Sequence, residues 1–128
     1  MLIKLLLVFF GAGAGGACRW GVQLACEQRF GKGFPAGTLI VNVLGCLAVG
    51  VLAGALAGPE PSREHWRLGL IVGFLGGFTT FSAFGRETVL LGSEGNHTAA
   101  VANIALSVGL GLLAVWIGAR LGTRLMAA

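Results

Sequence analysis

The chain has 128 residues, of which 55% are hydrophobic and 11% are charged, and its formal net charge is +4. Soluble domains carry about 25% charged residues, and a soluble protein of this length has no interior large enough to bury so much apolar surface. The nine lysines and arginines are scattered near the ends of apolar segments, which indicates interfacial anchoring rather than a nucleic-acid partner. We therefore expect an all-α integral membrane protein, with residues 1–128 forming one domain in contact with lipid.

Four apolar stretches are long enough to cross a bilayer. They lie at about residues 2–25, 34–57, 66–91 and 98–121, and short polar linkers join them at 27–33, 58–64 (which holds Pro59 and Pro61) and 92–97. Short linkers make sequential helices antiparallel neighbours, so we predict an up-down unit of four transmembrane helices. The first stretch also resembles a signal peptide, but its apolar core is only about six residues, and we favour a retained helix.

The first span is rich in glycine and alanine and carries Arg19 in its second half. One interpretation is an arginine that extends toward the membrane surface from a helix end. The other is a partly buried charge that makes a nearby site favourable to anions. Cys18, Cys26 and Cys46 show no metal-binding spacing, so we interpret them as small packing residues.

Polar residues recur at a one-turn spacing in the second and fourth spans. Thr38 and Asn42 are four residues apart, and so are Asn103 and Ser107. An asparagine amide offers two donors to a neighbouring helix or to an anion. Interhelical hydrogen bonds and an ion path therefore both remain open for these pairs.

The third span is interrupted near its middle, between Gly73 and Phe84, where the sequence reads GFLGGFTTFSAF. Lipid offers unpaired backbone groups no partner, so a helix breaks at this depth only if the break is buried in protein or lines a wet cavity. Broken helices at the bilayer midplane hold ions in many transport proteins. We therefore predict a break and an ion site in this segment.

The break predicts ligands of two kinds. Free carbonyls at residues 76–79 are hard oxygen ligands that suit a small monovalent cation. Phe81 and Phe84 are three residues apart and share a helix face just past the break. Packing is the usual role of such a pair, but the positive ring edges beside an amide donor could replace part of an anion's hydration shell.

Self-association is expected from the glycines and from the charges. Small residues recur four apart, which predicts tight helix contacts within or between subunits. These spacings are Gly11/Gly15, Gly50/Gly54, Gly54/Gly58, Gly69/Gly73, Gly73/Gly77 and Gly118/Gly122.

The difference in basic charge between the two ends of the predicted helices is small, so the chain could insert in both orientations and form an inverted pair by dimerisation. One end holds Lys4, Arg63, Arg67, Arg120 and Arg124, and the other holds Arg29 and Lys32, with Arg86 near the border.

Nothing in the sequence predicts an enzyme, since His65 and His97 lie in or beside linkers without a nearby nucleophile. A small multidrug-resistance-type exporter has the same size and helix number, but proton-coupled export needs a carboxylate within the membrane, and the first span has none before Glu27. A membrane scaffold subunit would explain the glycines but not the polar residues in mid-span. The carboxylate nearest the break is Glu87, several residues beyond it.

Three blocks together resemble the Fluc family of fluoride channels, also called CrcB-like proteins. They are the glycine-rich run that ends in Arg19, the block GTLIVNVLG at residues 37–45, and the block at residues 73–84. The resemblance covers essentially the whole chain. It implies an antiparallel, dual-topology homodimer in the cell (inner or plasma) membrane, which lets fluoride leave the cytoplasm passively and so reduces its toxicity.

The resemblance also implies roles for individual residues. Backbone carbonyls of Gly76 and Thr79 would hold a structural sodium ion (Na+) at the dimer interface. The fluoride path would be lined by Asn42, Phe81, Phe84, Asn103 and Ser107, to which we add Thr38, one turn from Asn42, with Arg19 as an electrostatic element. Ala83 departs from the family pattern, where a threonine is frequent, so a hydroxyl of the path is missing here.

Overall fold

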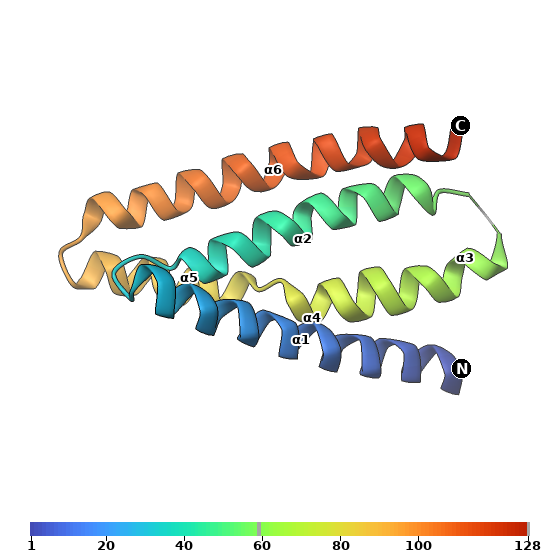
Figure 1. Ribbon diagram of the computed structural model, residues 1–128, viewed down its shortest axis with the longest axis horizontal. Helices are drawn as coiled ribbons and strands as arrows, with labels where there is room; N and C mark the ends of the chain where they lie inside the picture. The colour runs from blue at the N-terminus through green and yellow to red at the C-terminus, as the bar shows by residue number, and fades with distance from the viewer. Residues whose placement is uncertain (59, 128) are drawn as a thin grey trace.

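The computed structural model describes residues 1–58 and 60–127, except for the side chains of Ser62 and Ala127, and every regular element among these residues is helical (Figure 1). The elements are α1 (Leu2–Phe30), α2 (Ala36–Ala55), α3 (Pro61–Trp66), the π-helical stretch η1 (Arg67–Leu75), α4 (Gly76–Phe78), α5 (Phe81–Ser93) and α6 (His97–Ala127).

Four helical spans in the described chain are long and apolar enough to cross a membrane, which confirms the four predicted helices. They are Leu2–Phe30, Ala36–Ala55, Arg63–Ser93 and His97–Met126. The first and last continue past the predicted ends at 25 and 121, because polar residues beyond those ends, such as Glu27 and Arg124, are themselves good helix formers. Gly31 ends α1 with a φ of 77°, which residues with a side chain rarely adopt.

The predicted linker at 58–64 is wrong in its second half, because α3 already begins at Pro61. Proline suits the first helical position, since its fixed φ is helical and its missing N–H would have no partner there. Pro59, which was placed in the same linker, lies outside the described residues.

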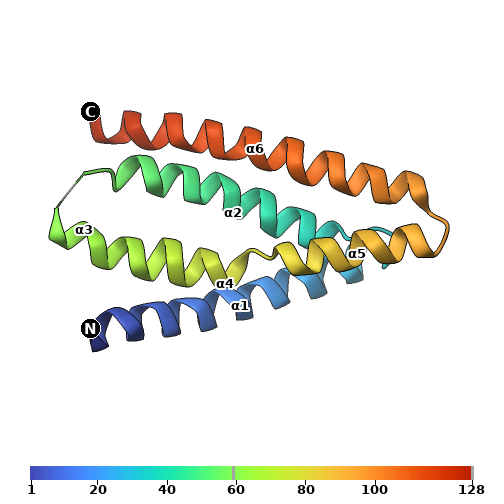
Figure 2. The same ribbon diagram turned by 180° about the vertical axis from the view of Figure 1, so that it is seen from behind.

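Sequential spans run antiparallel, so both chain termini lie at the same end of the molecule (Figures 1 and 2). The most extensive contacts, however, join alternate spans that run in parallel. Helix α2 packs along α6, and α1 packs along η1 and α4. The prediction that sequential helices are antiparallel neighbours is confirmed, since α1 contacts α2, α2 contacts η1, and α5 contacts α6, but the larger contacts between alternate helices were not predicted.

Glycines explain why these parallel pairs approach so closely. A Cβ atom added at Gly50 or Gly118 would collide with the backbone of the opposite helix, α6 or α2 respectively. The same holds between α1 and the third span, where a Cβ at Gly15 would meet the Phe74 carbonyl and one at Gly77 would meet the Ala12 carbonyl. The predicted contacts between small residues are confirmed for these two seams.

The third span is broken, as the sequence predicted, and the break lies at Thr79 and Thr80. Both residues are extended, with φ/ψ of −84°/158° and −154°/115°. The helix is already distorted before the break, since the amide of Gly76 bonds to the carbonyls of Gly73 and Ile71, and the second of these is a π-type bond across five residues. The span therefore consists of two helical halves joined by two extended residues (Figure 2).

Candidate functional site

The Asn42 side chain replaces hydrogen bonds that the break removes from the third span. Asn42 Oδ1 accepts from the Thr80 amide at 2.8 Å, and Asn42 Nδ2 donates to the Thr80 carbonyl at 3.0 Å. The two backbone groups fix which way the amide faces. Because an amide nitrogen carries two protons, one N–H of Asn42 is left to donate to a ligand.

The threonines of the break are bonded to the two helical halves. The amide and the hydroxyl of Thr79 both donate to the Leu75 carbonyl, at 2.9 and 2.8 Å. Thr80 Oγ1 accepts from the Ala83 amide at 3.2 Å and so caps the start of α5. The side chains of the break thus satisfy backbone groups that lipid would leave unpaired.

The Gly76 carbonyl does not have the hydrogen bond to Thr80 that it would have in a continuous helix. There its carbonyl would accept from the Thr80 amide, four residues on, but that amide bonds to Asn42 instead. Gly76 is exposed, and a Cβ added there would lie no closer than 3.9 Å to its nearest neighbour, the Ile71 carbonyl. Packing within the chain therefore gives no reason for a glycine at this position.

Arg19 lies beside the break. It is half-buried, and its Nη1 donates to the Thr79 carbonyl at 3.4 Å. Of the two interpretations of this arginine, this position suits a partly buried charge beside the site better than one that extends to the membrane surface. A guanidinium and a cation would, however, share the Thr79 carbonyl oxygen.

Phe81 and Phe84 line a cavity of about 380 Å³ next to the break. Their ring centroids are 5.5 Å apart, and their planes are tilted by 46°. Phe81 is 84% exposed whereas Phe84 is half-buried, so Phe81 projects outward from the bundle and Phe84 is partly covered by it. The polar residues in the lining are Asn42, Thr79, Thr80 and Ser107.

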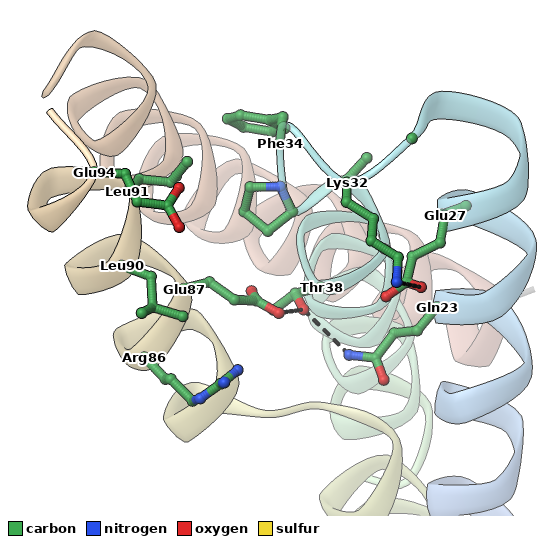
Figure 3. A pocket seen from close by; sticks show the side chains of 15 residues that line it. Gln23, Glu27, Lys32, Phe34, Thr38, Arg86, Glu87, Leu90, Leu91 and Glu94 are labelled. Atoms are coloured by element: carbon green, nitrogen blue, oxygen red, sulfur yellow. Dashed lines mark hydrogen bonds and ion pairs between the residues drawn. The ribbon is translucent and has the colours of Figure 1, made fainter. Parts of the chain in front are cut away.

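A second cavity, of about 440 Å³, lies toward the α1–α2 loop and contains Thr38 and Glu87 (Figure 3). Thr38 Oγ1 donates to Glu87 Oε1 at 2.8 Å and accepts from Gln23 Nε2 at 3.2 Å. Glu87 Oε2 is buried and has no hydrogen-bond partner among the described residues. Lys32 pairs with Glu27 at 3.8 Å in the lining of the same cavity.

Glu87, noted in the sequence only as the carboxylate nearest the break, is the site residue to which sequence reasoning gave no role. It lies inside the helical stretch Arg63–Ser93, half-buried and bonded to the second span. The sequence feature that could have identified it is its distance from Phe84. Glu87 follows Phe84 by three residues and therefore lies on the same helix face. The argument against an exporter concerned the first span, which has no carboxylate before Glu27, and the third span does contain one.

The predicted path residues fall into three places. Gly76 and Thr79 line the same cavity as Asn42, the two phenylalanines and Ser107, whereas Thr38 lines the second cavity. Asn103 lines neither of these two cavities. It is 1% exposed, donates to Thr88 Oγ1 at 2.9 Å and accepts from Ser107 at 3.4 Å, so it joins α6 to α5.

The described residues hold no cluster of three or more His, Cys, Asp or Glu side chains able to bind a metal ion. A cation at the break would therefore depend on backbone carbonyls.

The family model described as "CrcB-like protein, Camphor Resistance (CrcB)" matches residues 6–119. The chain belongs to the CrcB-like family. The fluoride-specific ion channel FluC of Solibacter usitatus is 44% identical over 122 residues, which cover 95% of this chain and all of that protein. The FluC of Coxiella burnetii is 43% identical over 96% of this chain and all of its own length, and that of Methylobacterium nodulans is 47% identical over 89% and 91%. These CrcB-like relatives are named as ion channels, which are transport proteins rather than enzymes, and the match decides against the multidrug-resistance-type exporter.

Proposed function

We propose that this protein is a fluoride-specific channel. The observation that supports the proposal is that Asn42, which bonds to both backbone groups of Thr80 and keeps a second amide N–H, lines one cavity together with Phe81 and Phe84. Fluoride is small and strongly hydrated, so a path must offer hydrogen-bond donors in place of water. The second amide N–H of Asn42 and the positive ring edges supply such groups, whereas the single proton of the Ser107 hydroxyl goes to Asn103 Oδ1. The names of the relatives support fluoride as the ion.

A sodium ion at the break is a second part of the proposal. The Gly76 carbonyl suits it, because the Thr80 amide, which would be its partner in a continuous helix, bonds to Asn42 instead. The Thr79 carbonyl is shared with Arg19, which makes it the weaker of the two proposed ligands. Hard cations take several oxygen ligands, so one chain supplies too few and a second copy would contribute the same pair.

A homodimer of oppositely oriented copies is the third part. Several helical glycines have no atom within 4 Å of an added Cβ, so packing within the chain does not explain them; they are Gly13, Gly16 and Gly21 on α1, Gly85 and Gly92 on α5, and Gly109 on α6. The exposed Phe81 ring also needs cover. The shallow charge difference between the two ends supports insertion in both orientations. A C-terminal tag found on only one side of the membrane would contradict dual topology.

In the cell the channel would let fluoride out of the cytoplasm across the inner or plasma membrane. Fluoride enters as HF from weakly acidic surroundings and is trapped as the anion, so a passive path outward lowers its toxicity. The channel would need no energy source for this.

The test is fluoride efflux from liposomes that contain the purified protein, followed with a fluoride electrode. We expect fast fluoride efflux and no chloride efflux under the same gradient. Because Glu87 lies within a span, efflux should also be compared with and without a proton ionophore at clamped membrane potential. If efflux requires a proton gradient, the protein is a fluoride/proton exchanger and not a channel. Absence of fluoride-selective efflux would overturn the proposal.

A further inference from the structure

Three helices are joined by a short chain of hydrogen bonds at the second cavity (Figure 3). Gln23 of α1 donates to Thr38 of α2, and Thr38 donates to Glu87 of α5. Thr38 is only 3% exposed, so bulk water does not compete for its hydroxyl.

The two hydrogen bonds that join Gln23, Thr38 and Glu87 can be donated in one direction only. The Gln23 NH2 group can only donate, so it occupies a lone pair of the Thr38 oxygen. The Thr38 hydroxyl has one proton, and that proton points to the Glu87 side, where the acceptor oxygen is 2.8 Å away. Without Gln23 the hydroxyl could rotate, because a hydroxyl turns to suit whichever partner is present.

The cavity on that side of Thr38 is lined by charges of both signs. Lys32 and Arg86 line the same cavity as Glu87. The carboxylates of Glu27 and Glu94 also line it, but Glu27 is paired with Lys32. An anion that reached Thr38 would meet the hydroxyl proton, in a cavity that also holds the basic side chains of Lys32 and Arg86.

We propose that Gln23 is a positioning residue, which holds the Thr38 hydroxyl as a donor toward the cavity so that it serves either the Glu87 carboxylate or a passing fluoride ion. The inference rests on the proposed fluoride channel. It assigns a role in conduction to a residue of the first span that lies outside the three blocks that resemble the family.

The test is a double-mutant cycle in fluoride-loaded liposomes, with Gln23→Leu, Thr38→Val and the double variant. One lost hydrogen bond of this kind is expected to change fluoride binding about three- to tenfold. Gln23→Leu should therefore raise the half-saturating fluoride concentration by that factor and leave the maximal flux nearly unchanged. In the Thr38→Val background the same substitution should have no further effect.

Gln23→Glu is the second variant, because it keeps the shape of the side chain and reverses its hydrogen bond. A carboxylate at position 23 would accept the Thr38 proton and turn it away from the cavity, so this variant should be more impaired than Gln23→Leu. The same change in the Thr38→Val background measures the effect of the added charge alone.

The outcomes separate the two proposals. Gln23→Leu could have the same effect in the wild-type and Thr38→Val backgrounds, or it could lower the maximal flux without changing the half-saturating fluoride concentration. Either result would overturn the positioning role of Gln23 and leave the channel proposal intact. A wild-type protein that carries no fluoride would overturn both.

Discussion

The side chain of Asn42 holds both backbone groups of Thr80, accepting from its amide at 2.8 Å and donating to its carbonyl at 3.0 Å. One asparagine on the second span thus makes the break in the third span tolerable. The same side chain faces the cavity beside Phe81 and Phe84, so the element that stabilises the break also belongs to the proposed ion path.

Replacing Asn42 by leucine should impair both stability and fluoride flux. Each Thr80 group left unpaired in an apolar setting costs about 1–3 kcal/mol, so the free energy of unfolding in detergent should fall by an amount of that order. Asn42→Asp separates the two roles, because it keeps the acceptor for the Thr80 amide and loses the N–H donors. We expect Asn42→Asp to lose flux with a smaller loss of stability, and normal flux in this variant would remove the donor from the mechanism.

Phe81→Ile should lower fluoride flux while the protein keeps its fold and its oligomeric state. The ring-edge contribution expected for such a contact is about 0.5–1.5 kcal/mol, or about a two- to tenfold fall in flux. Phe9→Ile is the matched control, because Phe9 is also exposed, at 68%, but lies on α1 away from the cavity. Equal flux in the two variants would place Phe81 outside the path.

Two glycines on the same helix should respond differently to the same substitution. Gly118→Ala puts a Cβ against the Leu47 carbonyl of α2 and should cost about 1–3 kcal/mol through separation of α2 from α6. Gly109→Ala meets nothing within 4 Å inside the chain, so the stability of the single chain should not fall. Chemical denaturation in detergent measures both, and a stable Gly118→Ala protein would contradict the close approach of the two helices.

Sodium should stabilise the assembled protein if the carbonyls of Gly76 and Thr79 bind it. Above the dissociation constant, each tenfold rise in sodium concentration adds about 1.4 kcal/mol to the free energy of unfolding for one site. The measurement is the unfolding midpoint in sodium, potassium and choline salts at equal ionic strength. Identical midpoints in the three salts would argue against a specific sodium site.

The spans and the break could be predicted from the sequence because each depends on local properties. An apolar run of about 20 residues is long enough to cross a bilayer wherever it packs. The pair of glycines and the hydroxyls at residues 76–82 mark the break without reference to the rest of the chain. The spacing of Gly50 and Gly54, and of Gly118 and Gly122, likewise predicted close helix contacts.

The partners of the polar residues could not be predicted, because they depend on how the helices align in three dimensions. Asn42 could have bonded to any span, and the sequence does not say that its partner is the backbone of Thr80. Asn103 was grouped with the path residues, yet its position against Thr88 is set by the register of α6 on α5. Glu87 was given no role because the contact with Thr38 joins residues 49 positions apart.

The two halves of the third span are attached to different parts of the molecule. The half before the break packs on α1 through the glycine seam. The half after it is tied to α6 by the Asn103–Thr88 bond and to α2 by the Thr38–Glu87 bond. The two extended threonines thus connect two helical halves that have different main neighbours, and the bonds from Asn42 hold this connection in place. A change in how the two halves lie against each other would therefore act on the backbone of Thr79 and Thr80, which line the cavity.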